Sequence, residues 1–421
     1  VEFHMKKKME ICIKRAGGLI RWVVLAGGVG LAAGLLVGLF GRCVAEATAF
    51  RASNPWMLYF LPAAGLAIVA LYRLDSYKAG TDCLLEGIQT KAVIPLRMAP
   101  LVLISTVLTH AFGGSAGRAG AVLQIGGSLG NAFGKWLKLD GYDHKIMLMC
   151  GMSAGFSALF GVPLTATVFS MEVASVGVMQ YAALVPCAVA ALAAKSIAGF
   201  VGARAESFSI SATAVLDWKN FLLVVVLAVL CALVSILFCT VIQGTGRLFK
   251  KYIPNEWLRI LAGAVLIILM AKLLDTADYL GAGMGVIELA VAGKVAAAAF
   301  ILKIIFTAVT LGSGFRGGEI APALFVGATF GCLFGQITGF PASLAAACGM
   351  AAVFCGVTNC PIASLFLCVE FFGADHMPFF LLAAGISYLE SGNYGLYRSQ
   401  KILYSKTKLQ DIVECLSRKT S

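Results

Sequence analysis

Long apolar runs dominate this sequence. Residues 19–40, 221–241 and 260–274 approach or exceed the length of about 20 helical residues that crosses a hydrocarbon layer of ~30 Å. Of the 421 residues, 60% are hydrophobic and 13% are charged, whereas a soluble domain carries roughly 25% charged residues. A chain with so little charge cannot cover its apolar surface in water. We therefore predict an all-α polytopic membrane protein with several spans.

The net charge of +12 is concentrated at the two ends of the chain. By the positive-inside rule, these basic flanks predict that both termini face the cytoplasm. The alternative, a tail that binds nucleic acid or lipid, is less favoured because flanks of this size are ordinary for orienting spans, and we expect no nucleic-acid partner. No cleavable signal peptide is evident. The basic residues are Lys6, Lys7, Lys8, Lys14, Arg15, Arg21, Arg398, Lys401, Lys406, Lys408, Arg418 and Lys419.

The cysteines and histidines do not form a recognisable metal or redox motif. Most of the 13 cysteines lie inside apolar runs, where a thiol acts as a small core residue. No CxxC pair occurs, and the four histidines are scattered. We expect no metal, no cofactor and no disulfide framework.

The chain contains an internal repeat at an offset of 198 residues, as from position 118 to position 316. In a hydrophobic chain, a repeat of this size is typical of transporters in which two halves meet at a central site. The alternative is a duplicated scaffold without a pathway. The pairs at this offset are Arg118 and Arg316, Gly120 and Gly318, Cys150 and Cys348, Pro163 and Pro361, and Glu172 and Glu370.

Glycine and proline interrupt the apolar runs at corresponding places in both halves. Helices are predicted to stop and restart within residues 113–120, 155–163, 312–322 and 356–361. Non-helical backbone at membrane depth is tolerated only inside protein or along a wet cavity. The first N–H groups of a restarted helix lack partners and carry about half a positive charge, so they favour an anion. Two glycine-rich starts therefore predict an internal anion pathway.

Four motifs resemble the CLC chloride channel and transporter family over roughly residues 70–405. GSAGRAGAVLQIGGSLG at 114–130 resembles the GREGP-type helix start, and GGEIAP at 317–322 resembles the GGxFAP element. AGFSALFGVPLTATVFSMEV at 154–173 resembles the family's segment with a central proline and a terminal acid, and Gly395, Leu396 and Tyr397 resemble the helix that bears the central tyrosine. The resemblance implies two inverted-topology repeats with broken helices and a homodimer with one pathway per subunit.

Departures from the chloride pattern resemble the CLC-F branch, bacterial exporters that exchange fluoride for protons. Where chloride members carry GSGIP, this chain has Ala79, Gly80, Thr81, Asp82 and Cys83, so the serine that contacts chloride is missing. Glu319 replaces an apolar residue, and Val173 stands where chloride/proton exchangers carry an inner acid. Chloride transport, coupled to protons or passive, is the alternative.

One departure concerns coupling, because the gating glutamate of the family aligns with Ala119. In the family that carboxylate competes with the anion and carries the proton, so alanine should leave the site open and impair exchange. Either the chain is an engineered variant, or it is a natural member with altered or passive transport.

The predicted site combines backbone at helix starts with a few polar side chains. Glu319 is expected to protonate and donate a hydrogen bond to fluoride, because a carboxyl in an apolar run is costly otherwise; pairing with Arg316 is the alternative. Tyr397 is expected to donate its O–H, with a place in an interfacial aromatic belt as the alternative. Arg118 is assigned to backbone positioning rather than to direct ligation. The anion-pathway residues are Ala79, Gly80, Thr81, Gly117, Arg118, Ala119, Gly120, Gly318, Glu319, Ile320 and Tyr397, of which Ala119 and Glu319 bear on proton coupling.

The predicted organisation has five parts in a bacterial cytoplasmic (inner) membrane. The partners expected are fluoride or chloride, protons and the lipid bilayer. A membrane-embedded enzyme is the competing class of function. The sequence contains no recognisable pair of nucleophile and base, so we expect that the protein is not an enzyme. The parts are a cytoplasmic segment at 1–18, a first repeat at 19–200, a connection at 201–216, a second repeat at 217–393, and a helix with a cytoplasmic tail at 394–421, without CBS domains.

Overall fold

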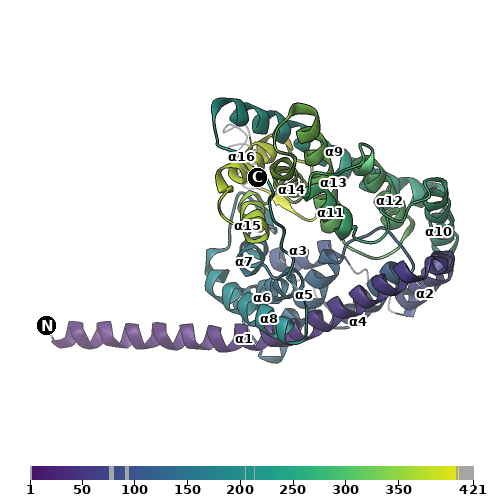
Figure 1. The fold of residues 1–421 in the computed structure, drawn as a ribbon. Helices are drawn as coiled ribbons and strands as arrows, with labels where there is room; N and C mark the ends of the chain where they lie inside the picture. Colours follow the sequence, from purple (N-terminus) through teal and green to yellow (C-terminus); the bar gives the residue numbers. More distant parts are fainter. Residues whose placement is uncertain are drawn as a thin grey trace, which may run out of the picture.

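The computed structural model describes residues 2–74, 80–90, 94–203, 205–212, 214–403 and 406, with only the backbone described for 2–15 and 74. The helices of the first half lie largely beside those of the second half (Figure 1). The first half contains α1 (Glu2–Ser53), η1 (Pro55–Phe60), α2 (Leu61–Leu74), α3 (Thr81–Gln89), α4 (Met98–Ala111), α5 (Ala119–Trp136), α6 (Gly141–Phe160), α7 (Pro163–Glu172), β1 (Ser175–Val176), η2 (Tyr181–Ala183) and α8 (Leu184–Phe200). The second half contains α9 (Trp218–Tyr252), α10 (Glu256–Leu273), α11 (Met284–Val291), α12 (Ala299–Ser313), α13 (Ile320–Thr338), α14 (Ala342–Thr358), α15 (Pro361–Phe372), α16 (Met377–Glu390) and β2 (Lys401–Ile402).

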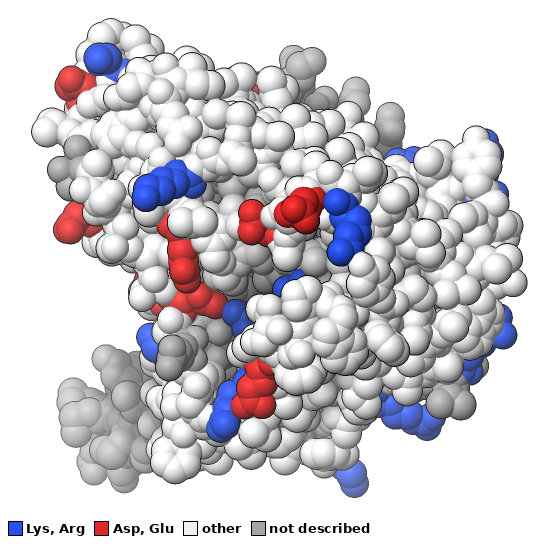
Figure 2. Space-filling view, turned by 45° about the vertical axis from the view of Figure 1, so that its right-hand side comes forward, with Lys and Arg blue, Asp and Glu red and all other residues white. Residues whose placement is uncertain are grey.

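Five described helical stretches are long and apolar enough to cross a membrane: Ala16–Ser53, Pro55–Arg73, Tyr181–Phe200, Trp218–Tyr252 and Ile320–Thr338. They include the predicted spans at 19–40 and 221–241. The third predicted span lies in α10. Large parts of the surface carry no Lys, Arg, Asp or Glu, and charged side chains lie around a hollow in the face shown in Figure 2. Such a surface suits contact with lipid.

All four predicted helix breaks are present. α4 is separated from α5 by residues 112–118, and α12 from α13 by residues 314–319. α6 ends at Phe160 and α14 at Thr358. The next residues, Gly161 and Asn359, are left-handed, and Val162 or Cys360 then precedes the proline that opens the following helix. Left-handed backbone ends a helix cheaply at glycine or asparagine, and proline is favoured at the first helical position.

The register of the repeat differs from the prediction in one segment. The offset of 198 relates the C-terminal ends of α6 and α14, because Gly161 and Asn359 are the left-handed residues that follow these helices. At the glycine-rich starts, however, α5 begins at Ala119 and α13 at Ile320, an offset of 201. The pairing of Arg118 with Arg316 and of Gly120 with Gly318 was therefore wrong.

The structure instead pairs Arg118 with Glu319, each of which is the residue preceding its helix. The offset changes from 201 to 198 because the two equivalent helices differ in length: α6 has 20 residues and α14 has 17. No single offset can therefore align the segments before and after these helices.

Glycines allow α5 to cross α6, and α13 to cross α14, at the same relative place. A Cβ on Gly151 would lie 2.9 Å from the backbone nitrogen of Gly130. A Cβ on Gly349 would collide with the carbonyl oxygen of Gly327 and lie 3.1 Å from Cα of Gly331. Small residues let helix backbones approach closely in membranes. These crossings hold the two glycine-rich helix starts in place.

Two glutamates cap helices of the opposite half. The Glu172 carboxylate, at the end of α7, accepts from the backbone nitrogens of Ile362 (3.3 Å) and Ala363 (2.9 Å) at the start of α15. Reciprocally, Glu370 at the end of α15 accepts from Leu164 and Thr165 at the start of α7. A carboxylate is favoured at a helix N-terminus. These contacts give both glutamates a structural role.

The segment after α16 differs from the prediction of a helix beginning at residue 394. Residues 394–403 are not helical, and β2 within them pairs in parallel with β1, Ser175 opposite Lys401. Contacts with several helices hold this segment in a non-helical conformation with a bend and a turn, as described below. The remainder of the predicted tail lies mostly outside the described residues.

We predict that Gly349→Ala destabilises the protein by about 1–3 kcal/mol, because the added methyl group forces α13 and α14 apart. Gly385→Ala on α16 is the matched control. A Cβ there meets nothing within 4 Å, so helix propensity should make this change neutral or stabilising by up to about 1 kcal/mol. Thermal unfolding of both variants in detergent measures the difference. Equal midpoints would contradict the proposed role of the crossing.

Candidate anion site

A short backbone bridge joins the two halves at the glycine-rich helix starts. The nitrogen of Gly117 donates to the carbonyl of Gly318, and the nitrogen of Gly318 donates to the carbonyl of Gly117, both at 2.7 Å. A Cβ on Gly120 would lie 3.0 Å from Cα of Gly318, and a Cβ on Gly317 would collide with Ala116. Glycine at these positions therefore brings the first turns of α5 and α13 together.

Three helix N-termini converge at this bridge without a side-chain cap. α3 begins after Gly80, α5 after Arg118 and α13 after Glu319, and none of these residues caps its helix through a side chain. Elsewhere the chain supplies such caps, as when Asp140 accepts from Tyr142 and Asp143 at the start of α6. Uncapped N–H groups and the helix dipoles make this junction favourable for an anion.

A cavity of about 190 Å³ lies at the three helix starts. Residues from both halves line it, including four of the predicted pathway residues: Gly80, Thr81, Glu319 and Tyr397. We call it the central cavity. Its other lining residues are Tyr72, Asp82, Val102, Thr106, Ala121, Gln124, Leu311, Phe315, Arg316 and Leu396.

Tyr397 offers an unused hydroxyl to the central cavity. Its side chain is 7% exposed, and its Oη has no hydrogen-bond partner in the described part of the chain. A buried hydroxyl without a partner is costly, so the group is suited to a ligand. Tyr397 also lines a cavity of about 430 Å³ with Arg247 and Arg398, and thus stands between the two spaces.

Contacts from three helices, α14, α9 and α3, fix the position of Tyr397. The nitrogen of Leu396 donates to the carbonyl of Val357 at 2.8 Å, and Gln243 of α9 donates to the carbonyl of Gly395 at 2.9 Å. On the other side, Asp82 of α3 accepts from the backbone nitrogen of Ser399 at 3.1 Å. These contacts explain why the segment is held without being helical.

Sequence reasoning missed two polar groups of the central cavity. Thr106 of α4 is fully buried, and its Oγ1 has no partner among the described residues. Gln124 of α5 donates to the carbonyl of Gly120 at 3.1 Å and lies 3.5 Å from Thr81 Oγ1. The QIG run marked Gln124 as part of a motif, whereas nothing in the apolar sequence around Thr106 distinguished it from an ordinary buried threonine.

Glu319 lines the central cavity and forms no ion pair within the described residues. The alternative pairing with Arg316 is absent, because that guanidinium lies over the ring of Tyr72, 4.1 Å from its centroid. A carboxyl group away from bulk water is costly when charged and unpaired. The geometry therefore leaves Glu319 able to hold a proton or to face a ligand.

Arg118 and Ala119 are turned away from the central cavity. Arg118 forms an ion pair of 2.8 Å with Glu206 of the segment between α8 and α9 and lines a third, larger cavity. Ala119 is fully buried at the start of α5, and Ile320 is buried at the start of α13. Ala79 lies outside the described residues, so the structure does not test its predicted role.

The sequence profile described as "Voltage gated chloride channel" matches residues 78–392. The chain belongs to this CLC family. It is therefore a membrane-integral protein, and its helical fold with two inverted repeats is the CLC fold.

Relatives and solved structures agree with this assignment. A "Chloride/fluoride channel protein" of Pseudomonas syringae pv. tomato is 35% identical over 92% of this chain and 88% of its own length. The crystal structure of a CLC-type fluoride/proton antiporter superposes with a TM-score of 0.85, at 31% identity over 91% of this chain and 98% of that one. A slow cyanobacterial Cl⁻/H⁺ antiporter shares the fold at 19% identity, with a TM-score of 0.77. Relatives of this kind confirm that the chain is a transport protein rather than an enzyme.

Proposed function

We propose that this chain exports fluoride across a bacterial cytoplasmic membrane by CLC-type exchange with protons. The observation that carries the proposal is the central cavity, where three uncapped helix N-termini, the free Tyr397 hydroxyl and the unpaired Glu319 carboxyl come together. The fluoride antiporter that shares the fold and the 35% identical chloride/fluoride channel support it.

Fluoride is small and strongly hydrated, so a site that removes its water must supply short hydrogen bonds in return. The central cavity offers hydroxyl donors from Thr106 and Tyr397, which have no other described partner, and from Thr81. A protonated Glu319 adds a carboxylic O–H donor at the same place. A site built from donors to a strong acceptor discriminates well, because weaker acceptors leave those buried donors poorly paired.

Proton movement depends on two positions. Glu319 is the carboxyl group of the central cavity and can carry a proton with the anion. Ala119 stands where the family's gating glutamate is expected, so this chain lacks the carboxylate that would compete with the anion. Coupling is therefore impaired relative to a member with glutamate there, and anion movement is faster or less tightly gated.

The basic flanks place both termini in the cytoplasm. α1 then runs outward, so that its end at Ser53 and the cavity beside Arg118 face the outside, while the cavity beside Arg247 and Arg398 faces the cytoplasm. The protein works as a homodimer with one pathway per subunit, as the family resemblance implies. The five-part division at residues 18, 200, 216 and 393 belongs to the same proposal.

Efflux from liposomes tests the substrate. We expect the purified chain to release fluoride, measured with an ion-selective electrode, much faster than chloride from matched vesicles. Empty liposomes supply the background. Equal fluxes of the two ions would favour the alternative, a chloride/proton antiporter or passive anion channel, and would contradict fluoride selectivity.

Glu319→Gln tests the carboxyl group. Glutamine keeps a hydrogen-bond donor but cannot release a proton, so fluoride efflux should persist while fluoride-driven proton movement is lost. Glu319→Ala removes the donor as well and should slow fluoride efflux about tenfold or more, the loss expected for a strong hydrogen bond to an ion. Unchanged proton flux in Glu319→Gln would remove this residue from the coupling mechanism.

Ala119→Glu tests the gate. The restored carboxylate should slow passive fluoride efflux and introduce or strengthen proton movement driven by a fluoride gradient. Ala119→Gln is the matched control, with the same size but no titratable group. If the two variants move equal numbers of protons, position 119 does not act as the gate.

A further inference from the structure

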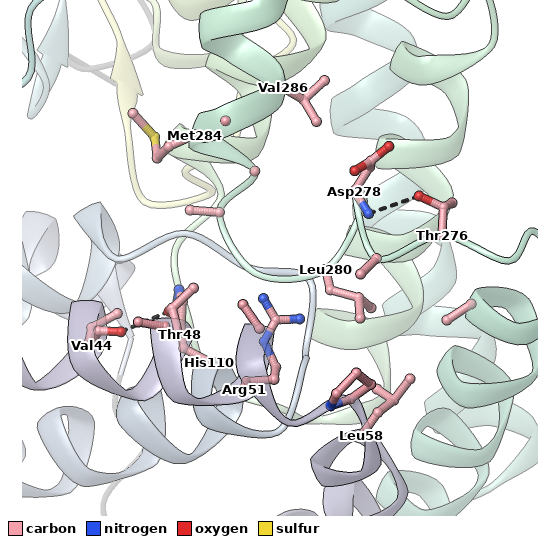
Figure 3. A pocket seen from close by; sticks show the side chains of 18 of the residues that line it. Val44, Thr48, Arg51, Leu58, His110, Thr276, Asp278, Leu280, Met284 and Val286 are labelled. Carbon is pink, nitrogen blue, oxygen red and sulfur yellow. Dashed lines mark hydrogen bonds between the residues drawn. The ribbon is translucent and has the colours of Figure 1, made fainter.

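A large cavity of about 830 Å³ lies beside the Arg118 end of the bridge (Figure 3). The second half of α1, the end of α4 and the segment from α10 to α11 form its walls. Arg51 of α1 and His110 of α4 both line it, and the guanidinium of Arg51 and one ring nitrogen of His110 project toward its interior. We call it the arginine cavity.

His110 has an orientation that plain packing does not explain. Its side chain is 1% exposed, and Nδ1 lies 2.8 Å from the carbonyl oxygen of Thr106. A carbonyl only accepts, so Nδ1 carries a proton. Nε2 has no partner in the described part of the chain. In neutral His110, Nε2 therefore keeps an unshared lone pair that can accept a proton.

Positive charge around His110 exceeds the negative charge near it. The guanidinium of Arg51 lies beside Gly113 and Gly281. Lys303 is fully buried, and its ammonium group donates to the carbonyls of Tyr279 at 3.1 Å and Gly281 at 2.7 Å. Neither cation has a carboxylate within ion-pair distance among the described residues. The charged groups facing this region are Arg51, Arg118, Lys303 and, across the cavity, Lys272, Asp275 and Asp278, with Glu206 paired to Arg118.

These charges make protonation of His110 depend on an anion. Without one, Arg51, Arg118 and Lys303 oppose an imidazolium. An anion in the cavity cancels part of that field, and Nε2–H then becomes one more donor to it. By linkage, the proton must strengthen anion binding as much as the anion strengthens protonation.

We propose that the arginine cavity is a second site, which takes up a small monovalent anion together with a proton on His110 Nε2. The proton comes from the solution on that side, and no other bond changes. The inference rests on the proposed anion transport and adds to it a proton-binding group separate from Glu319 and position 119. α4 connects the two sites, because the Thr106 carbonyl that holds His110 belongs to the residue whose hydroxyl lines the central cavity.

Proton uptake on anion binding tests this proposal. Purified protein in detergent, weakly buffered near neutral pH, is titrated with sodium fluoride and separately with sodium chloride, and bound protons are counted with a pH electrode. Wild type should take up protons as the anion binds. His110→Gln should lose the share that belongs to this site, while His144→Gln should not, because that ring is already bonded to Asn131 at 2.8 Å.

Arg51→Gln should weaken the linked anion binding at least about fivefold, the lower end of typical coupling between sites. Arg42→Gln is its control, since Arg42 is exposed on the same helix and paired with Glu46. Nitrogen NMR of histidine-labelled wild type provides a second readout, in which fluoride should convert the His110 ring to its doubly protonated form. Equal proton uptake in the two histidine variants, or an unchanged ring signal, overturns the proposal.

Efflux measured on the same proteins separates this inference from the proposed function. If fluoride efflux fails but His110-dependent proton uptake occurs with chloride, the fluoride proposal is wrong and the second site stands. If fluoride efflux is normal and His110→Gln takes up as many protons as wild type, the second site is wrong and the proposed function stands.

Discussion

The two reciprocal hydrogen bonds between Gly117 and Gly318 are the contact on which the pathway depends. They hold the starts of α5 and α13 together, so that two partial positive charges meet inside the protein. That arrangement is unfavourable by itself, and nothing in the first residues of either helix caps it. The close packing of the crossing glycines imposes it, and an anion bound at the junction would relieve it. The proposed binding site is thus a consequence of the way the halves join.

Two other helix N-termini in the same fold are capped by glutamate side chains, which leaves them no free N–H groups for an anion. α7 and α15 begin at equivalent places in the two halves, and Glu370 and Glu172 satisfy their first nitrogens across the interface. The starts of α5 and α13 have no such carboxylate from the opposite half, and they lie together at the central cavity. In the proposed pathway these open N-termini face the anion, and the family resemblance at position 119 identifies the place where a carboxylate would close one.

Much of this arrangement could be predicted from glycine and proline, because their backbone limits act locally. All four helix breaks and the convergence of Gly80, Glu319 and Tyr397 on one cavity follow from that signal and from the family motifs. The shift of register from 198 to 201 could not be predicted, since a helix shortened by one turn leaves its hydrophobic pattern intact. The place of Thr106 at the cavity and the non-helical Tyr397 segment depend on contacts distant in sequence, which no local pattern contains.

The corrected register changes how the two halves are compared, because it makes Arg118 and Glu319 equivalent rather than Arg118 and Arg316. Inverted repeats place equivalent positions on opposite sides of the membrane midplane. One side therefore carries a guanidinium paired with Glu206 beside the arginine cavity, and the other carries an unpaired carboxyl in the central cavity. Under the proposed function, the first side attracts an anion and the second offers it a carboxyl group that can hold a proton. The two ends of a symmetric scaffold thereby carry different chemistry.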